Sequence, residues 1–370
     1  MTPRRLEALL REAAARAFDL SPEEVPFVWP RHDQADGTAD AATALAPRLL
    51  GKVAARLPPG GGRGRRHHLL VCGRVAAQLE SMREAGLADF ARVLCDGRGF
   101  LNITFTGDQR DALVAEASDG PLFLTGRDWD GAGEWPRTAL HDAGPVAQAR
   151  RLARADARGR IALATGPLLP PPGPGDADVS WRDPYLDGDR SGLVTPAARA
   201  LGAVGEDSAR VAFCRSVPER PRATETTGRD LPVLPSAEYP GAWTRLTDAN
   251  PAFRLRHAHA HAVTSGRWTA EGAPPPAACP AHTAAVRGLL FDGPGVLDTA
   301  ARREEPHILV RYLEALASAY DEWRTCPHAA AGPAERTTSD TVTATALPAA
   351  VAGVLRTGLF LLGVSAPTRL

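Results

Sequence analysis

The chain has 370 residues, of which 44% are hydrophobic, and its 43 basic residues equal its 43 acidic residues, so the formal net charge is zero. A chain of this length buries one or two cores. Zero net charge excludes a bulk positive field, and any contact with RNA must therefore come from a local basic surface. No run of about 18 apolar residues is present, as a membrane-spanning helix would need, and residues 1–18 lack the apolar core of a signal peptide. We therefore expect no membrane partner.

The five cysteines, at positions 72, 95, 214, 279 and 326, lie far apart and form no C-x-x-C pair. This pattern predicts free thiols in a reducing compartment, and hence a cytoplasmic protein. Lys52 is the only lysine, which leaves no second lysine for catalysis.

Residues 1–125 predict a small α+β domain. Thr2 and Pro3 have the character of an N-cap and a first helical position, and apolar residues follow at helical spacing. The Ala- and Leu-rich stretch 39–57 predicts a second helix, whereas the runs 69–72 and 100–105 are typical of short strands.

Residues 126–239 contain a PPPGP cluster at 170–174 and several Gly, Pro and Asp runs, which predict a degenerate connector. Residues 240–370 return to helical spacing and predict an all-α bundle. Two stripes of apolar residues in this bundle are expected to lie in its core. The helix that carries the second stripe is expected to end before Gly363. The first stripe comprises Ile308, Tyr312, Leu313, Leu316, Tyr320 and Trp323, and the second comprises Val351, Leu355, Leu359 and Leu362.

The segment NPAFRLRHAHAH, residues 250–261, resembles the N-P-x-F-Y-V-Q-Y-A-H-A-R segment that opens the anticodon-binding domain, called DALR, of arginyl-tRNA synthetases. Residues 305–320, EPHILVRYLEALASAY, are similar to the E-P-H-x-x-x-x-Y-L-x-x-L-A-x-x-F helix of that domain. The final LLGVSAPTRL, residues 361–370, resembles the terminus L-L-G-V-x-A-P-x-R-M of the family.

Other parts of the chain are also similar to this family. Residues 97–105, GRGFLNITF, resemble the G-x-G-F-x-N strand of its N-terminal additional domain, and residues 29–37, WPRHDQADG, partly match the P-R-x-x-x-x-G-D-Y-A segment. Residues 190–216 resemble the stretch that follows the K-M-S-K loop of the family. The resemblance covers about two thirds of the chain and implies the fold of both RNA-gripping ends of such an enzyme.

The catalytic motifs of the family are absent. No H-x-G-H occurs, the nearest fragment being HDAG at 141–144, and LDGD at 186–189 stands at the K-M-S-K positions. Adenylate formation needs cationic donors around the phosphates, and two acidic side chains there oppose it. We therefore expect no catalytic residue and no cofactor; the alternative, a working ligase, would use ATP and arginine.

The resemblance implies tRNA contacts at two places. Where the family has aromatic residues, a glutamine and a closing arginine, this chain has Arg254, Arg256, His257 and His261, which keep donors for RNA but remove aromatic platforms. The predicted tRNA-binding residues of the anticodon domain are Asn250, Arg254, Arg256, His257, His259, His261 and Arg369, and those of the N-terminal domain are Asn102, Arg65 and Arg66.

Two patterns allow other interpretations. His257 and His261 have a spacing that can hold zinc, and Cys279-Pro-Ala-His282 offers two further ligand types, but we interpret the first as family positions and the second as a loop, and predict no metal. Basic clusters at 63–68 and 150–160 are equally typical of phosphate contacts and of solvated charge.

Three hypotheses follow. The first is a non-catalytic protein that binds tRNA, in particular arginine isoacceptors, and presents it to a tRNA-modifying or transferring enzyme, with no DNA partner. The second is a divergent arginine–tRNA ligase or a transferase that uses arginyl-tRNA. The third is a protein-interaction scaffold without RNA binding.

Overall fold

The structure is a computed structural model that describes residues 1–32, 39–57, 65–128, 138–166, 195–217, 219–222, 224–270, 279–326 and 338–369. The chain divides into two compact units. The N-terminal unit comprises Met1–Glu116, Arg287–Gly295 and Glu335–Thr343, and the C-terminal unit comprises Ala117–Val286, Val296–Ala334 and Ala344–Leu370. The expected three-part division at 125 and 239 stays a prediction.

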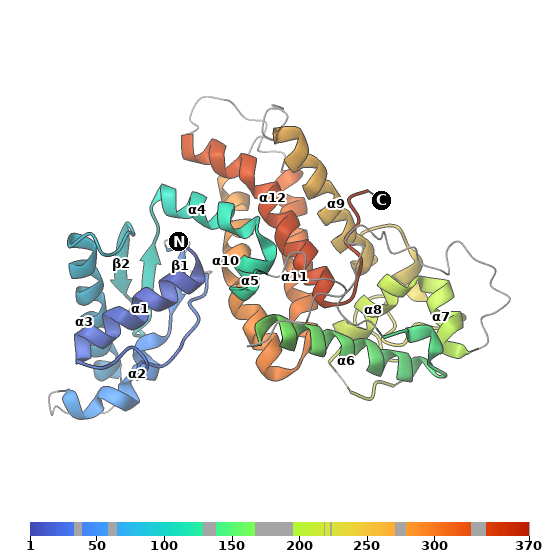
Figure 1. Cartoon of the computed structure of the whole chain (residues 1–370), viewed down its shortest axis with the longest axis horizontal. Coiled ribbons are helices and arrows are strands. Elements are labelled where there is room, and N and C mark those ends of the chain that lie inside the picture. The colour runs from blue at the N-terminus through green and yellow to red at the C-terminus, as the bar shows by residue number, and fades with distance from the viewer. Residues whose placement is uncertain are drawn as a thin grey trace. The chain divides into compact units, whose positions relative to one another are not determined.

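The N-terminal unit consists of helices packed on a small sheet (Figure 1). The sheet has the strand order β1-β3-β2, all antiparallel, and Ile103 pairs with Ala41 on one side and Val93 on the other. Helix α3 packs against α1, α2 and β2. In chain order, the elements are α1 (Pro3–Phe18), β1 (Ala41–Thr43), α2 (Leu45–Val53), the 3₁₀ turn η1 (Ala54–Arg56), α3 (Arg65–Glu84), β2 (Arg92–Cys95), β3 (Leu101–Thr104) and α4 (Gly107–Ala117).

One predicted element of this unit is wrong, one is right only in part, and two are confirmed. The run 69–72 lies inside α3, because it continues at helical spacing to buried Val75 and Leu79 and a four-residue run cannot reveal that period. The stretch 39–57 begins with strand β1 and becomes helical only at Leu45. The cap of α1 is confirmed, since the Thr2 side chain accepts a hydrogen bond from the N–H of Arg5, and so is the strand within residues 100–105.

The expectation of five free thiols is also wrong. Cys72 of α3 and Cys95 of β2 form a disulfide, with their Cα atoms 5.9 Å apart. The 23-residue separation concealed the pair, because only the packing of α3 on β2 brings the two residues together. The other three cysteines keep their thiols.

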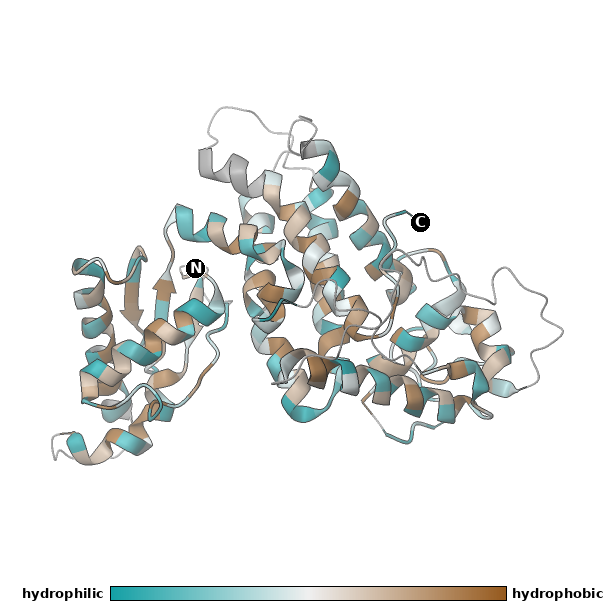
Figure 2. Ribbon diagram, viewed as in Figure 1, coloured by the Kyte–Doolittle hydropathy of each residue, from teal (hydrophilic) through white to brown (hydrophobic). Residues whose placement is uncertain are grey.

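The C-terminal unit is helical (Figure 1). Helix α8 packs against α6, α7, α9 and α11, and α9 also packs against α11. These helices carry both apolar and polar residues (Figure 2), as expected for helices that bury one face and expose the other. The elements are α5 (Gly120–Thr125), the 3₁₀ turn η2 (Leu140–Asp142), α6 (Val146–Thr165), α7 (Pro196–Val204), α8 (Glu206–Arg215), the 3₁₀ turn η4 (Gly241–Thr244) and α9 (Pro251–Ala270), together with most of α10 (Pro280–Arg303), all of α11 (Pro306–Arg324) and most of α12 (Thr338–Leu361).

The predicted fold class, an α+β domain followed by an all-α bundle, is confirmed. Five of the six residues of the first predicted stripe and all four of the second are buried; Ile308 is half-buried. Gly363 follows α12 with a φ of 70°, the left-handed conformation that ends helices. Across the described part of the chain, no helix has the length and apolarity needed to cross a membrane.

Candidate nucleic-acid interface

The helix that carries most of the predicted RNA contacts, α9, begins at a side-chain cap. The Asn250 amide nitrogen donates to the carbonyl oxygens of Trp243 at 2.7 Å and Arg245 at 3.1 Å. Its Oδ1 accepts from the N–H of Ala252 at 3.0 Å, which satisfies a helix donor that would otherwise lack a partner. Asn250 is 2% exposed, so its polar atoms serve the start of α9 and are turned away from the surface.

One face of α9 carries half-buried polar side chains with unused hydrogen-bonding capacity. The Nε atom of Arg254 and the Nδ1 atom of His257 are shielded from water and have no partner among the described residues. The His257 ring stacks on Phe253 with 5.5 Å between ring centroids and an interplanar angle of 17°. The face therefore combines a guanidinium with a flat pair of rings.

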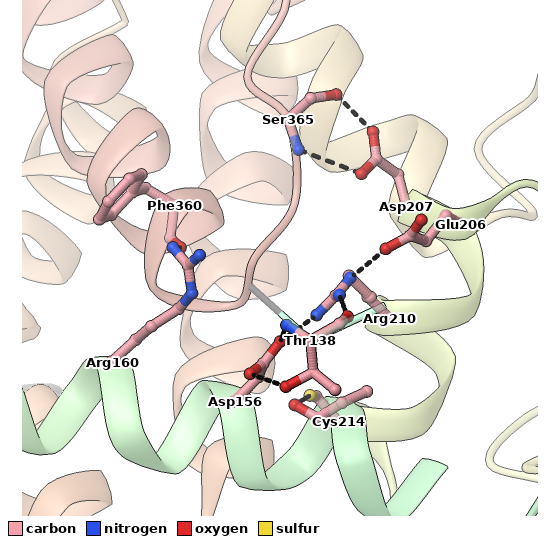
Figure 3. Close-up of polar contacts among 10 residues, drawn as sticks. Thr138, Asp156, Arg160, Glu206, Asp207, Arg210, Cys214, Phe360 and Ser365 are labelled. Atoms are coloured by element: carbon pink, nitrogen blue, oxygen red, sulfur yellow. Dashed lines mark hydrogen bonds and ion pairs between the residues drawn. The ribbon is translucent and has the colours of Figure 1, made fainter. Parts of the chain in front are cut away.

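Arg256 lies beside the first turn of α8. Its Nη2 is 3.7 Å from Oδ2 of Asp207, and its Nε is another buried atom without a described partner. Asp207 accepts hydrogen bonds from both the backbone N–H, at 3.2 Å, and the hydroxyl of Ser365 (Figure 3). One carboxylate thus links α8, α9 and the C-terminal tail.

His259 is buried, at 2% exposure, and attaches α9 to the tail. Its Nδ1 lies 3.0 Å from the carbonyl oxygen of Pro367, and because a carbonyl only accepts, Nδ1 carries the proton. Burial lowers the pKa of His259, with a smaller contribution from Arg356, so the ring is neutral at neutral pH. Arg369 follows two residues later and is exposed.

His261 is half-buried, and its ring contacts α11. Its Nδ1 lies 3.1 Å from the Tyr320 hydroxyl and 3.3 Å from the Ser265 hydroxyl. Burial, followed by repulsion from Arg324 and His257, lowers the pKa of His261. The predicted residues of α9 thus divide into interior positions, Asn250 and His259, and the half-buried Arg254, Arg256, His257 and His261.

The N-terminal candidates are less well defined. Asn102 is half-buried in the central strand β3, where it pairs with Ala42 and Leu94. Arg65 and Arg66 begin α3, but their side chains lie outside the described residues, as do positions 186–189 where the catalytic loop of the family would fall.

In the basic cluster at 150–160, Arg150 and Arg154 are neither phosphate contacts nor solvated charges. Arg150 and Arg154 are 1% and 2% exposed. Arg150 donates to the Ser216 hydroxyl at 2.7 Å, and Arg154 to the Ser216 carbonyl at 2.5 Å and the Glu219 carboxylate at 3.2 Å. Burial, followed by repulsion from Arg154, lowers the pKa of Arg150 to about 10, so Arg150 remains charged at neutral pH. Both arginines join α6 to the segment after α8.

Sequence reasoning missed three contributors near the α9 face. Phe253 matches the phenylalanine of the family segment at 250–261, and it forms the ring stack with His257. Arg324 and the exposed Arg356 are near enough to His261 and His259 to affect their pKa. Both lie on helices distant in sequence, so no local pattern indicates them.

Comparisons with known proteins agree with this architecture. A family model described as the DALR anticodon binding domain matches residues 285–370. A protein from Clavibacter sepedonicus named arginine–tRNA ligase is 32% identical over 195 residues, which cover 51% of this chain and 32% of that protein. A second protein of that name, from Kineococcus radiotolerans, is 26% identical over 322 residues, 80% of this chain and 52% of the relative.

The chain thus spans about a third to a half of the length of these curated relatives. Among solved structures, Thermus thermophilus arginyl-tRNA synthetase is similar, with a TM-score of 0.54, 14% identity and 100% coverage of both chains. At that identity the similarity concerns the fold.

Proposed function

Since the chain is related to the arginyl-tRNA synthetase family and carries its DALR anticodon-binding domain, we propose that it binds tRNA through α9 and does not catalyse aminoacylation. The observation that carries the proposal is the face of α9. There the half-buried Arg254 lies beside the Phe253–His257 stack, and the half-buried Arg256 lies on the side of α9 that is next to α8. Guanidinium groups bind phosphates, and stacked rings receive unpaired bases.

The interface is local, which fits a protein of zero net charge. Arg356 and Arg369 are exposed near the same helix through the His259–Pro367 contact. Phosphate contacts then supply affinity, and base stacking supplies a preference for a single-stranded loop such as an anticodon. Arginine isoacceptors are the substrate class that the family relationship favours.

Absence of catalysis is supported by the sequence. H-x-G-H is missing from these 370 residues, and the only lysine is Lys52. Its Nζ donates to the carbonyl of Glu24 within the N-terminal unit. No ATP or arginine is then needed for binding, and the bound tRNA would be presented to a modifying or transferring enzyme.

The first test is filter retention of a tRNA panel at near-physiological salt, without ATP or arginine. We expect arginine isoacceptors to bind at least tenfold more tightly than non-cognate tRNAs. Equal binding of all tRNAs would contradict the preference for arginine tRNA, and absence of binding would leave a protein-interaction scaffold.

The names of the relatives favour one alternative, a divergent arginine–tRNA ligase. Arginine-dependent exchange of pyrophosphate into ATP measures this activity directly, with a full-length arginyl-tRNA synthetase as positive control. We expect no exchange above background. Exchange that requires arginine would establish the ligase and reject the non-catalytic proposal, whatever the tRNA affinity.

A further inference from the structure

Three side chains of types that can ligate a metal meet where α10 begins and α11 ends. Cys279, His282 and Cys326 each offer one ligand atom, and these atoms all lie within 4.8 Å of one another. Among the described residues this is the only such group of three or more. The expectation that Cys279-Pro-Ala-His282 is a loop without further ligands is therefore wrong: Cys279 is the N-cap of α10, and His282 lies in its first turn.

Two helices bring these residues together. Cys326 lies two residues after the last residue of α11, and its proximity to Cys279 and His282 places the end of α11 beside the start of α10. The Trp323 indole N–H donates to the Thr283 hydroxyl at 3.1 Å, and both side chains are buried. This bond holds the two chain segments next to the cluster, independently of any ligand.

One residue of the cluster has unused hydrogen-bonding capacity. Nδ1 of His282 is shielded from water and has no hydrogen-bond partner in the described part of the chain. A buried polar atom without a partner destabilises the folded state, and a metal bond would offset this cost. Cys326 is 7% exposed, and Cys279 and His282 are half-buried, so water has limited access.

We propose that Cys279, His282 and Cys326 bind a zinc ion. Two thiolates and one imidazole are the donors that zinc prefers over magnesium or calcium. In a tetrahedral zinc site with bonds of roughly 2.0–2.3 Å, donor atoms lie about 3.3–3.8 Å apart, so closing the present cluster takes shifts of about 1 Å. The fourth position is left to water or another donor.

The ion would join the first turn of α10 to the end of α11, the helices that open the segment matched by the DALR model. Zinc binding to thiolates releases protons and stabilises the folded state. The site serves the stability of the bundle and is independent of whether the protein binds tRNA.

The test uses the full-length protein, purified under reducing conditions and loaded with zinc, with bound metal measured by mass spectrometry after gel filtration. We expect one zinc per chain in the wild type, and loss of at least 80% of it in C279S, H282A and C326S. C214A removes a buried thiol elsewhere and should keep the metal. H282C, which restores a zinc ligand, should also keep it.

Cobalt loading distinguishes specific ligation from a loosely bound ion. The wild type and H282C should show sulfur-to-cobalt charge transfer and the intense visible bands of tetrahedral cobalt, whereas C279S and C326S should not. Chelation should lower the Tm of the wild type and leave that of C326S unchanged. Zinc content unaffected by C279S and C326S, or a reduced wild type that binds no zinc, would reject the site in favour of a simple thiol pair.

Discussion

Arg210 of α8 donates to Asp156 of α6 across 3.0 Å, and the Arg210 side chain is completely buried (Figure 3). The same guanidinium also donates to Glu206 at 2.8 Å and to the Thr138 carbonyl at 2.7 Å. Burial tends to raise the pKa of Asp156, but hydrogen bonds from Thr138 and Arg210 outweigh it and hold the pKa below its usual value. Buried ion pairs, in addition to apolar contacts, thus hold α6 and α8 together.

We expect Arg210→Met to lower the free energy of unfolding by about 3–5 kcal/mol, because it leaves the Asp156 carboxylate buried without its partner. Adding Asp156→Leu should recover at least half of that loss, since no uncompensated charge then remains. Urea denaturation measures both. A single variant that unfolds like the wild type would show that the ion pair contributes nothing to stability.

Much of the bundle is predictable from sequence because its helices have long apolar stripes, such as Val351 to Leu362, that only a 3.6-residue period explains. The buried arginines are not predictable in this way. Arg150, Arg154 and Arg210 resemble surface charge in the sequence. Their partners Ser216, directly after α8, and Asp156, on α6, come from other parts of the chain. Burial of a charge depends on such partners, which local patterns do not contain.

The candidate site was also predictable from the sequence only in part. The family resemblance selected α9, but it treated Asn250 and His259 as equivalent to Arg254, whereas the first two are buried and serve a helix cap and the tail. Likewise, Cys326 lies 47 positions after Cys279 in the numbering, so only the packing of α10 beside α11 reveals the cluster.

The RNA interface can be tested by charge removal. We expect Arg254→Gln and Arg256→Gln each to weaken tRNA binding about three- to tenfold and to reduce the salt dependence by about one phosphate contact. Arg302→Gln is the matched control, because Arg302 is an exposed arginine in the same unit, paired with Asp298. Equal weakening by all three would reveal a general charge effect and argue against α9 as the interface.

Stability should fall as the solution becomes acidic. Burial lowers the pKa of His259 and of His261, whereas in the unfolded chain histidine titrates near about 6.5. Below that pH the unfolded state binds more protons, so the contribution of these residues is complete above pH about 6.5 and is lost as the pH falls toward the folded pKa. His259→Asn keeps a donor for the Pro367 carbonyl and should flatten the slope of stability between about pH 7 and 5. His141→Asn, at an exposed position, should not.

Two glycines mark where α5 meets α12. A Cβ atom on Gly120 would lie 2.0 Å from the Gly353 carbonyl oxygen, so the backbones must shift. Gly120→Ala should therefore destabilise the protein by about 1–3 kcal/mol. Gly159→Ala in α6 has open space around the added atom and should be stabilising by about 0.5–1 kcal/mol through helix propensity. Thermal unfolding of the two variants compares them, and equal Tm values would contradict the close contact.

The Cys72–Cys95 disulfide closes a loop between α3 and β2. Peptide mapping without reduction should recover the two cysteines in one linked fragment. Reduction, or Cys72→Ala with Cys95→Ala, should lower the free energy of unfolding by about 3 kcal/mol through the restored freedom of the unfolded chain. Both treatments should act on the N-terminal unit and leave the zinc content of the C-terminal cluster unchanged, because the two sites share no residue. Recovery of both cysteines as alkylated thiols from unreduced protein would show that the bond does not form.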